Sequence, residues 1–257
     1  MQAKKLILIL TDGMRPDAIE AVSHPLPGIL AAEGQYLPNA SSIVPPVTLP
    51  CHMSLFHSVP SSRHGILTNS YIPLARPLPG LFEVLHDAGK RCAFFYNWEP
   101  LRDLGRPGSL TKSLFLSQAE LEGTDRLLAE AAAGCIQKEA PDFLFLYLGE
   151  TDEAGHKYGW MSQEYLTRVQ TAWDCIAKLH QAAGQDYAMI VTADHGGHER
   201  NHGTECKEDM TIPLFLWGMD APKPSAASLL DIAPTIAAFL GVPPHKDWEG
   251  KNLLGSR

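Results

Sequence analysis

The sequence predicts an α/β fold with a doubly wound, mostly parallel sheet and helices on both of its faces. Three continuous apolar runs, Leu6–Leu10, Asp142–Leu148 and Ala188–Val191, are typical of strands that are buried on both faces. Long segments with apolar residues at helical spacing, Gly123–Glu139 and Ser162–Ala183, alternate with these runs. Such alternation favours parallel strands that are joined by crossover helices.

The composition is that of an ordinary globular protein. The chain has 257 residues, of which 45% are hydrophobic and 19% are charged. No internal repeat, low-complexity segment or clear linker interrupts it, so we expect one catalytic domain over residues 1–257. The net charge of −8 argues against a surface that binds nucleic-acid duplexes.

Cysteine usage and the lengths of the apolar runs predict a cytoplasmic protein. The five cysteines are odd in number, widely spaced and form no CxxC pair, which suits reduced thiols. The N-terminal apolar run ends at Thr11 and Asp12 without a small-residue cleavage site, so we expect a first strand rather than a secretory signal. No stretch approaches the roughly 20 apolar residues that span a bilayer, so no membrane partner is expected.

The first part of the chain is expected to contain two short helices on either side of an irregular segment. Arg15–Val22 is predicted to be a short helix, and Cys51–His57 the first turns of another. Pro38–Pro50, which is rich in Ser, Thr and Pro, is expected to be irregular. Thr48 therefore lies near a helix N-terminus, where backbone N–H groups favour negative charge. A threonine there serves as a cap or, with an activator, as a nucleophile.

The remaining elements follow from turn residues and periodicity. Pro213 lies inside an apolar run, and because proline cannot donate to a sheet ladder it indicates an edge position or a bulge. Ser162 is a plausible cap for the helix that it begins. The other expected elements are a turn at Pro60–Gly65, a helix at Leu81–Ala88, a strand at Arg91–Tyr96, a loop at Leu101–Leu116, a strand at Met210–Trp217 and a helix at Ser228–Leu240.

Polar side chains with metal-ligand chemistry follow three of the predicted strands. Asp12 comes directly after the first strand, Asp152 and His156 follow the second buried run, and Asp194 and His195 follow the third. Because the carboxyl ends of parallel strands meet at one edge of a sheet, we expect these side chains to converge. Taken singly, Asp12 is also explained as a helix cap, and Asp152 with His156 as an exposed i,i+4 pair.

The stretch Val191–Gly203 concentrates this chemistry. It holds Asp194, His195, His198 and His202, and its glycines let the backbone turn so that several side chains can face one point. Three carboxylates beside neutral imidazoles form an unstable cluster unless cations offset their charge. Two divalent ions would do so, and a two-metal site suits phosphoryl transfer. The alternative is a polar surface loop in which the histidines occur by chance.

The sequence also resembles a known family. Six segments carry the resemblance in family order over nearly the whole chain: LILTDGMRPDAI at 8–19, PPVTLPCHMSLFHSVPSSRHGILTN at 45–69, ETDEAGHKYG at 150–159, TADHGGH at 192–198, NHGTE at 201–205 and DIAPTIAAFLGVP at 231–243. They make the chain similar to the type I phosphodiesterase/nucleotide pyrophosphatase branch of the alkaline phosphatase superfamily. The resemblance implies an alkaline phosphatase-like fold and a hydrolase of phosphate esters.

The resemblance also implies roles for individual residues. It gives Thr48 as a nucleophile that passes through a phospho-threonine intermediate, and Asn69 as a donor to a non-bridging phosphoryl oxygen. It implies two divalent ions, expected to be Zn²⁺ with Mn²⁺ as the alternative, and a small-molecule phosphate ester or nucleotide as substrate. The implied metal ligands are Asp12, Thr48, Asp194 and His195 for one ion, and Asp152, His156 and His202 for the other.

The chain departs from the family in a way that bears on the substrate. Phosphodiesterases of the family carry a long insertion between the Asp-His pair and the last histidine, whereas His195 and His202 are only seven positions apart. We therefore expect a fold that lacks a large cap insertion and leaves the site open. The short gap makes His198 a rival for the last ligand position, but the family order of segments favours His202.

A few nearby residues have two interpretations each. Cys51 lies close to Thr48 as in a sulfatase, but the CxPxR run that such enzymes need is absent, so an ordinary helix residue is expected. Tyr158 and Trp160 could flank a substrate ring, and Arg200 could meet a phosphate. For these three residues, ordinary packing or a solvated loop is the competing expectation.

Two other functions remain open from the sequence. A phosphomonoesterase or phosphonate hydrolase would use the same two metals. A monoester dianion generally needs an additional cation, and the core motifs offer only Arg15, Arg63 and Lys157. A protein that binds metal without catalysis is the alternative from a different class, and the presence of Thr48 argues against it.

Overall fold

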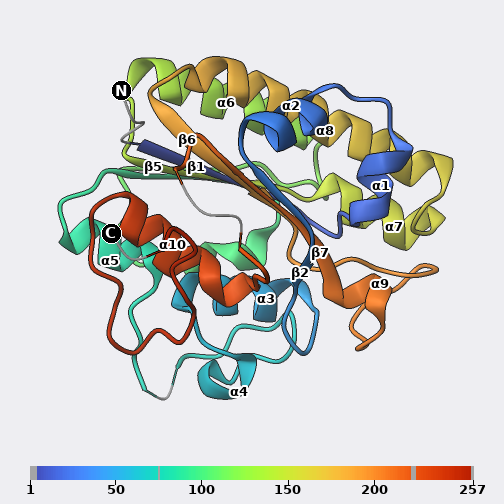
Figure 1. The fold of residues 1–257 in the computed structure, drawn as a ribbon. Helices are drawn as coiled ribbons and strands as arrows, with labels where there is room; N and C mark the ends of the chain where they lie inside the picture. The colour runs from blue at the N-terminus through green and yellow to red at the C-terminus, as the bar shows by residue number, and fades with distance from the viewer. Residues whose placement is uncertain (1–4, 75, 221–223, 256–257) are drawn as a thin grey trace.

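A computed structural model describes residues 5–74, 76–220 and 224–255 (Figure 1). At its centre is a seven-stranded sheet with the strand order β2-β7-β6-β1-β5-β3-β4. All neighbouring strands pair in parallel except β7, which is antiparallel to both β2 and β6. The strands are β1 (Lys5–Thr11), β2 (Gln35–Ser41), β3 (Cys92–Tyr96), β4 (Lys112–Phe115), β5 (Phe143–Leu148), β6 (Tyr187–Thr192) and β7 (Thr211–Trp217).

Helices cover both faces of this sheet, which confirms the predicted doubly wound α/β fold (Figure 1). One face carries α1 (Pro16–Ala21), α2 (Leu26–Glu33), α6 (Thr124–Lys138) and α8 (Gln163–Ala183), and the other carries α3 (Thr48–His57), α5 (Leu81–Asp87) and α10 (Ile232–Phe239). The shorter elements are α4 (Ser61–His64), η1 (Glu99–Leu104), α7 (Glu150–Tyr158), α9 (Lys207–Met210) and η2 (Leu229–Asp231). Within the described ranges, no helix is both long and apolar enough to cross a membrane.

An aromatic cluster holds α3 against the centre of the sheet. Phe145 of β5 is fully buried, and its ring centroid lies 5.0 Å from that of Phe56 on α3 and 5.1 Å from that of Phe94 on β3. Burial of such side chains is the main source of favourable folding energy. The contact fixes the position of α3, the helix that begins at Thr48.

The prediction that Pro38–Pro50 is irregular is wrong at both ends of the segment. Strand β2 continues to Ser41, and α3 begins at Thr48 rather than at Cys51. The prediction failed because β2 is stabilised by antiparallel pairing with β7, which is distant in sequence. Local Pro, Ser and Thr content cannot report such pairing.

Two further elements were misassigned from the sequence. The expected loop at Leu101–Leu116 contains the short edge strand β4, which pairs in parallel with β3. The expected turn at Pro60–Gly65 contains the one-turn helix α4. The helix expected at Ser228–Leu240 is confirmed, with the 3-10 turn η2 as its first turn and α10 as the rest. The other expected elements lie within one residue of their predicted ends.

Pro213 does not lie on an edge strand, because β7 sits between β2 and β6. The irregularity that the proline requires is found in the neighbouring strand. Leu37 pairs with Leu214 and Ala40 with Ile212, so two residues of β2 face the single position of Pro213. Proline has no N–H to donate to the sheet ladder, and the bulge provides an irregular position where that donor is not required.

Two buried acidic residues cap each other's helices beside β5. Asp125, in the first turn of α6, accepts the Gly149 N–H at the N-terminus of α7 (3.1 Å). Glu150, the first residue of α7, accepts the Asp125 N–H (3.3 Å) and the Thr124 hydroxyl (3.2 Å) at the N-terminus of α6. Arg168 of α8 lies 3.0 Å from the other Glu150 oxygen and offsets part of the charge. The helix that follows β5 is thereby fixed to α6.

Replacement of Asp125 by Ala should lower the free energy of unfolding by about 2 kcal/mol, because the buried Gly149 N–H loses its acceptor. Urea denaturation followed by circular dichroism measures the change. Asp174→Ala is the control, since the Asp174 side chain on α8 is about half exposed and its carboxylate lies 3.7 Å from Arg126 Nη2 and 3.6 Å from His24 Nε2. The two contacts of this half-exposed carboxylate should contribute less than about 1 kcal/mol. Equal effects of the two substitutions would contradict the reciprocal-cap interpretation.

Candidate metal and active site

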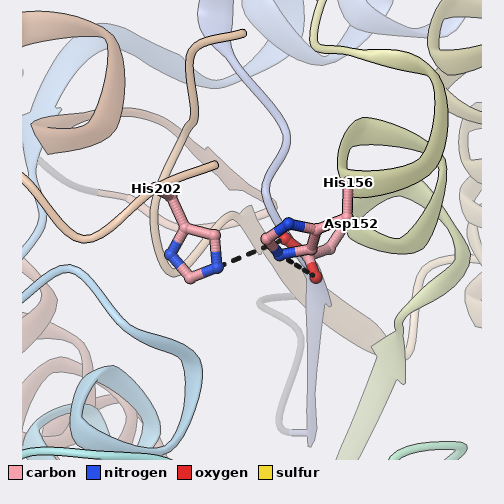
Figure 2. Close-up of side chains that lie close together, drawn as sticks. All are labelled: Asp152, His156 and His202. Carbon is pink, nitrogen blue, oxygen red and sulfur yellow. Dashed lines mark ion pairs between the residues drawn. The ribbon is translucent and has the colours of Figure 1, made fainter. Parts of the chain in front are cut away.

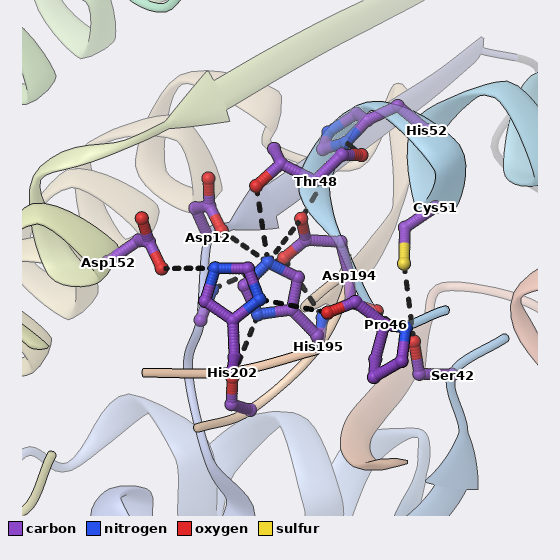
Figure 3. Close-up of polar contacts among 12 residues, drawn as sticks. Asp12, Ser42, Pro46, Thr48, Cys51, His52, Asp152, Asp194, His195 and His202 are labelled. Atoms are coloured by element: carbon purple, nitrogen blue, oxygen red, sulfur yellow. Dashed lines mark hydrogen bonds and ion pairs between the residues drawn. The ribbon is translucent and has the colours of Figure 1, made fainter. Parts of the chain in front are cut away.

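The carboxyl ends of β1, β5 and β6 bring three carboxylates to one edge of the sheet (Figure 3). Asp12 follows β1, Asp152 lies in the first turn of α7 after β5, and Asp194 follows β6. The Gly13 N–H donates to Asp194 Oδ1 (3.2 Å) and ties the ends of β1 and β6 together. Asp12 and Asp194 are almost completely buried. The convergence expected from the strand ends is thus present in the fold.

The first group of side chains gathers around His195 (Figure 3). His195 Nε2 lies 3.2 Å from Thr48 Oγ1 and 3.3 Å from both Asp12 Oδ1 and Asp194 Oδ2. Its Nδ1 lies 2.8 Å from the Gly196 carbonyl oxygen, so Nδ1 carries the proton and Nε2 presents a lone pair. Asp12 Oδ1 and Asp194 Oδ2 are buried without a hydrogen-bond partner. Electron-rich atoms facing one another in this way fit a cation at their centre.

The second group consists of Asp152, His156 and His202 (Figure 2). The Nδ1 atoms of His156 and His202 lie 3.0 Å and 2.9 Å from the carbonyl oxygens of Arg200 and Pro46, respectively. Both Nε2 atoms therefore present lone pairs, and they lie 3.5 Å and 3.7 Å from the Asp152 carboxylate. Asp152 Oδ1 is buried and has no hydrogen-bond partner. This group also fits a cation.

The separations of these atoms match those around a shared metal ion. Ligand atoms of a tetrahedral zinc ion lie roughly 3.3 Å apart, given Zn–N and Zn–O bonds of about 2.0–2.1 Å. The close approaches in the two groups run from 3.2 Å to 3.7 Å, longer than most direct hydrogen bonds. Both groups are therefore suitable sets of metal ligands. The Asp152 side chain joins them, because it also lies within ligand distance of Asp12 and His195.

His198 lies in a different group with Cys206 and Asp209. Its Nδ1 is 2.7 Å from Asp209 Oδ1, which is the distance of a direct hydrogen bond. Asp209 Oδ2 accepts the N–H and the hydroxyl of Thr204, each at 2.8 Å. These hydrogen bonds account for the closeness of the three side chains without a metal ion. They stabilise the loop that precedes α9. The geometry thus places His202, and not His198, beside Asp152.

Burial and mutual repulsion make the three carboxylates difficult to ionise without a cation. Burial, followed by the Asp194 charge, raises the pKa of Asp12 well above its ordinary value. Burial, followed by the Asp12 charge, does the same for the pKa of Asp152. The pKa of Asp194 rises to about 7 through burial and then the charge of Asp152. Burial also lowers the pKa of His202 to about 3, so its imidazole is neutral, as a metal ligand must be.

Thr48 and Asn69 meet at the N-terminus of α3. Thr48 is the first residue of the helix, and it is buried with its hydroxyl beside His195. Asn69 Oδ1 accepts the Leu49 N–H (3.0 Å), so the side-chain amide group of Asn69 is left as a donor. The Thr48 N–H has no hydrogen-bond partner among the described residues. Two donors beside a hydroxyl at a helix N-terminus suit an anionic group.

Tyr147 was not recognised from the sequence as a positioning residue, and for His52 a loop or packing role was preferred over support of the ligands. The Tyr147 hydroxyl donates to Asp12 Oδ2, which leaves the other Asp12 oxygen facing His195. Its sequence signal was a hydroxyl-bearing residue within the apolar run of β5. His52 is fully buried, and its Nδ1 lies 2.8 Å from the Thr48 carbonyl oxygen and 3.7 Å from Asp194 Oδ2. No spacing rule links His52 to its carboxylate partner.

The structure shows the surroundings of the four residues for which the sequence left two interpretations. Trp160 is only 7% exposed and packs inside the molecule, which favours the packing interpretation. Tyr158 is 43% exposed, and Arg200 is exposed and bonds His156 through its main-chain carbonyl. Cys51 is buried in α3, and burial raises the pKa of its thiol, which makes it a structural helix residue.

Comparison with known proteins gives a family match and several relatives. A family model described as type I phosphodiesterase / nucleotide pyrophosphatase matches residues 6–212. The chain is 32% identical over 160 residues to a 2,3-bisphosphoglycerate-independent phosphoglycerate mutase of Methylobacillus flagellatus, covering 58% of the chain and 29% of the mutase. It is 26% identical over 262 residues to the bis(5'-adenosyl)-triphosphatase ENPP4 of Bos taurus, covering 92% and 54%. The chain thus spans only part of the length of these relatives.

A solved structure shares the fold along nearly the whole chain. It is murine ectonucleotide pyrophosphatase/phosphodiesterase 5, in an inactive threonine-to-alanine variant in complex with AMP. The match has a TM-score of 0.77 with 15% sequence identity, and it covers 98% of this chain and 100% of that one. At this identity the likeness shows the shared fold, which agrees with the alkaline phosphatase-like architecture expected from the sequence.

The metal-free protein should lose stability as pH rises from about 4 to about 7, the interval between the ordinary and raised pKa values of Asp194. A raised carboxyl pKa means that the native state holds the proton more tightly than the unfolded state, so deprotonation weakens folding. Zn²⁺ or Mn²⁺ should therefore raise the melting temperature more at pH 7.5 than at pH 5. Differential scanning fluorimetry after chelation measures both effects. A melting temperature unaffected by pH and by metal would contradict the proposed cation sites.

Proposed function

The chain belongs to the type I phosphodiesterase/nucleotide pyrophosphatase family, and we propose that it hydrolyses phosphate esters with two divalent metal ions bound. The family match confirms the resemblance that the sequence motifs predicted. One observation supports the catalytic proposal most directly. The Thr48 hydroxyl faces the same centre as His195 and two buried carboxylate oxygens that have no hydrogen-bond partner.

The two ligand groups would each hold one ion. Asp12, Thr48, Asp194 and His195 form the first group, and Asp152, His156 and His202 form the second. Divalent ions supply positive charge that acidifies a hydroxyl and stabilises developing oxyanions. The ligand types are all Asp, His and Thr, which suit Zn²⁺, with Mn²⁺ as the alternative.

Thr48 is proposed as the nucleophile. Its hydroxyl loses a proton, and Oγ1 forms a bond to phosphorus while the bond from phosphorus to the leaving oxygen breaks. The leaving oxygen takes up a proton and departs as an alcohol, and a phospho-threonine ester remains. Water then attacks phosphorus, the bond between phosphorus and Oγ1 breaks, and a proton of the water passes to Oγ1. With a diester as substrate, this step releases a phosphate monoester and restores the Thr48 hydroxyl. The murine relative that is inactive as a threonine-to-alanine variant supports a threonine in this role.

Asn69 and the N-terminus of α3 are proposed to hold the phosphoryl oxygens. The Leu49 N–H fixes the Asn69 carbonyl oxygen, so the amide nitrogen is the part that remains for the substrate. The Thr48 N–H adds a second donor from the backbone of the nucleophile itself. Donors that are fixed before the reaction stabilise charge on the equatorial oxygens without reorganisation.

The cations of the core motifs favour a diester or a nucleotide over a monoester dianion. Arg15 bonds Asp17 and the Gly197 carbonyl oxygen. Arg63 pairs with Glu249, and the Lys157 ammonium lies over the Tyr158 ring. Each is engaged away from Thr48, so a doubly charged phosphate would lack the additional cation that it generally needs. The relatives named for a dinucleoside triphosphate and solved with AMP support a nucleotide substrate.

Replacement of Thr48 by Ala should reduce kcat for bis-p-nitrophenyl phosphate by at least about 10³-fold, because no nucleophile remains. Thr48→Ser keeps the hydroxyl and should retain measurable turnover. Release of p-nitrophenol measures both variants, and bound metal is checked by elemental analysis. Unchanged turnover in Thr48→Ala would contradict the phospho-threonine mechanism. Faster hydrolysis of p-nitrophenyl phosphate than of the diester would replace the proposal with a phosphomonoesterase.

Replacement of Asn69 by Asp should reduce kcat by about 10²–10³-fold. The Asp side chain keeps an oxygen for the Leu49 N–H and exchanges only the donor nitrogen for an oxygen that repels phosphate. The N-terminus of α3 is thereby left intact, and the melting temperature should change little. A variant with full kcat would show that the Asn69 amide does not contact the reacting phosphate.

A further inference from the structure

The indole ring of Trp160 lies flush against the backbone at three glycines. A Cβ atom built at Gly13 would lie 3.3 Å from a ring atom, one at Gly155 would lie 2.6 Å away, and one at Gly197 would lie 2.2 Å away. Distances below 3.0 Å are not tolerated between a Cβ atom and a packed ring. At Gly155 and Gly197 the ring therefore occupies space that is free only because these positions are glycines, and at Gly13 it lies in tight contact.

Each of these glycines adjoins a candidate metal ligand. Asp12 directly precedes the first, His156 directly follows the second, and His195 lies two positions before the third. The ring also makes edge contacts with His156 (centroids 5.1 Å apart) and His202 (5.9 Å apart). Trp160 thus contacts segments that supply ligands to both groups, and these segments come from separate parts of the chain.

Hydrogen bonds fix the orientation of this ring. The Trp160 indole N–H donates to the Gly13 carbonyl oxygen (2.9 Å), which also accepts from the Tyr165 hydroxyl (2.9 Å). The Trp160 main-chain N–H donates to the Glu199 carbonyl oxygen (2.7 Å), in the loop that leads to His202. Trp160 is thus bonded through its side chain to the end of β1 and through its main chain to that loop. Rotation of the indole ring would break its bond to the Gly13 carbonyl oxygen.

We propose that Trp160 is a positioning residue that holds His156 and His202 in place relative to Asp12, so that ion binding by the second ligand group depends on it. The inference rests on the proposed two-metal function. A smaller side chain leaves the three glycine segments without a common support, because none of them has a side chain to fill the gap. The two histidines then lose the alignment that brings their Nε2 atoms toward Asp152.

Trp248 provides a matched control. It is also buried (9% exposed), and its indole N–H also donates to a main-chain carbonyl, that of Pro79 at 3.1 Å. Trp248→Phe therefore removes the same ring size and the same kind of hydrogen bond as Trp160→Phe. A general loss of stability affects both variants, whereas a positioning effect is confined to Trp160.

The test is a titration of the chelator-treated proteins with Zn²⁺, followed by competition against a metal indicator. Trp160→Phe should lower the affinity for one of two bound equivalents by about 10–100-fold, and Trp248→Phe should leave both affinities unchanged. Because Trp160 contacts two ligand histidines, ion binding should also change the tryptophan emission. That change should vanish in Trp160→Phe and persist in Trp248→Phe.

The outcomes separate the two proposals. Wild-type affinity for both equivalents in Trp160→Phe would overturn the positioning role and leave the two-metal function in place. An equal loss of affinity in both variants would also overturn it, because the effect would then be general destabilisation. A wild-type protein that binds no Zn²⁺ or Mn²⁺ would overturn the two-metal function and this inference together.

Discussion

The burial of three mutually repelling carboxylates at one edge of the sheet is the constraint on which the site depends. Burial first, and then the charge of a neighbouring carboxylate, raises the pKa values of Asp12, Asp152 and Asp194. Charges buried in this way are retained only with compensation. The histidines nearby turn their protonated nitrogens toward main-chain carbonyls, which aims lone pairs rather than protons at the carboxylates. The fold therefore directs negative charge and lone pairs to a centre that a cation would neutralise.

The surrounding structure holds these groups in place through several independent supports. Tyr147 holds one oxygen of Asp12, and the Phe145 cluster fixes α3 and with it Thr48. The mutual caps of Asp125 and Glu150 fix α7. Tyr147 and Phe145 are both on β5, whereas Asp125 and Glu150 join α6 to α7. Ligand geometry is therefore a property of the packed domain core and not of the ligand loops alone.

The sequence was sufficient for the central strands and for the convergence of polar residues at their ends, because both follow from apolar runs and parallel pairing. It was insufficient for β2 and β4, which exist through pairing with distant strands. The start of α3 at Thr48 depends on packing and was placed too late. The packing partners of Trp160 could not be predicted, because they are glycines whose spacing carries no hydrophobic signal. The ligand assignments themselves came from family resemblance, and the geometry is compatible with them.

The hydrogen bond from the Leu49 N–H to Asn69 has a consequence for stereochemistry at phosphorus. It fixes which end of the Asn69 amide is free, and the Thr48 N–H at the first position of α3 is a backbone donor. Under the proposed function, these two donors differ in chemical type and direction. The phosphorus of an unsymmetrical phosphodiester is prochiral, because its two non-bridging oxygens are chemically alike but lie on opposite sides of the molecule. Asn69 and the Thr48 N–H would each bind one of these oxygens. The site would therefore distinguish the two non-bridging oxygens before it recognises any leaving group.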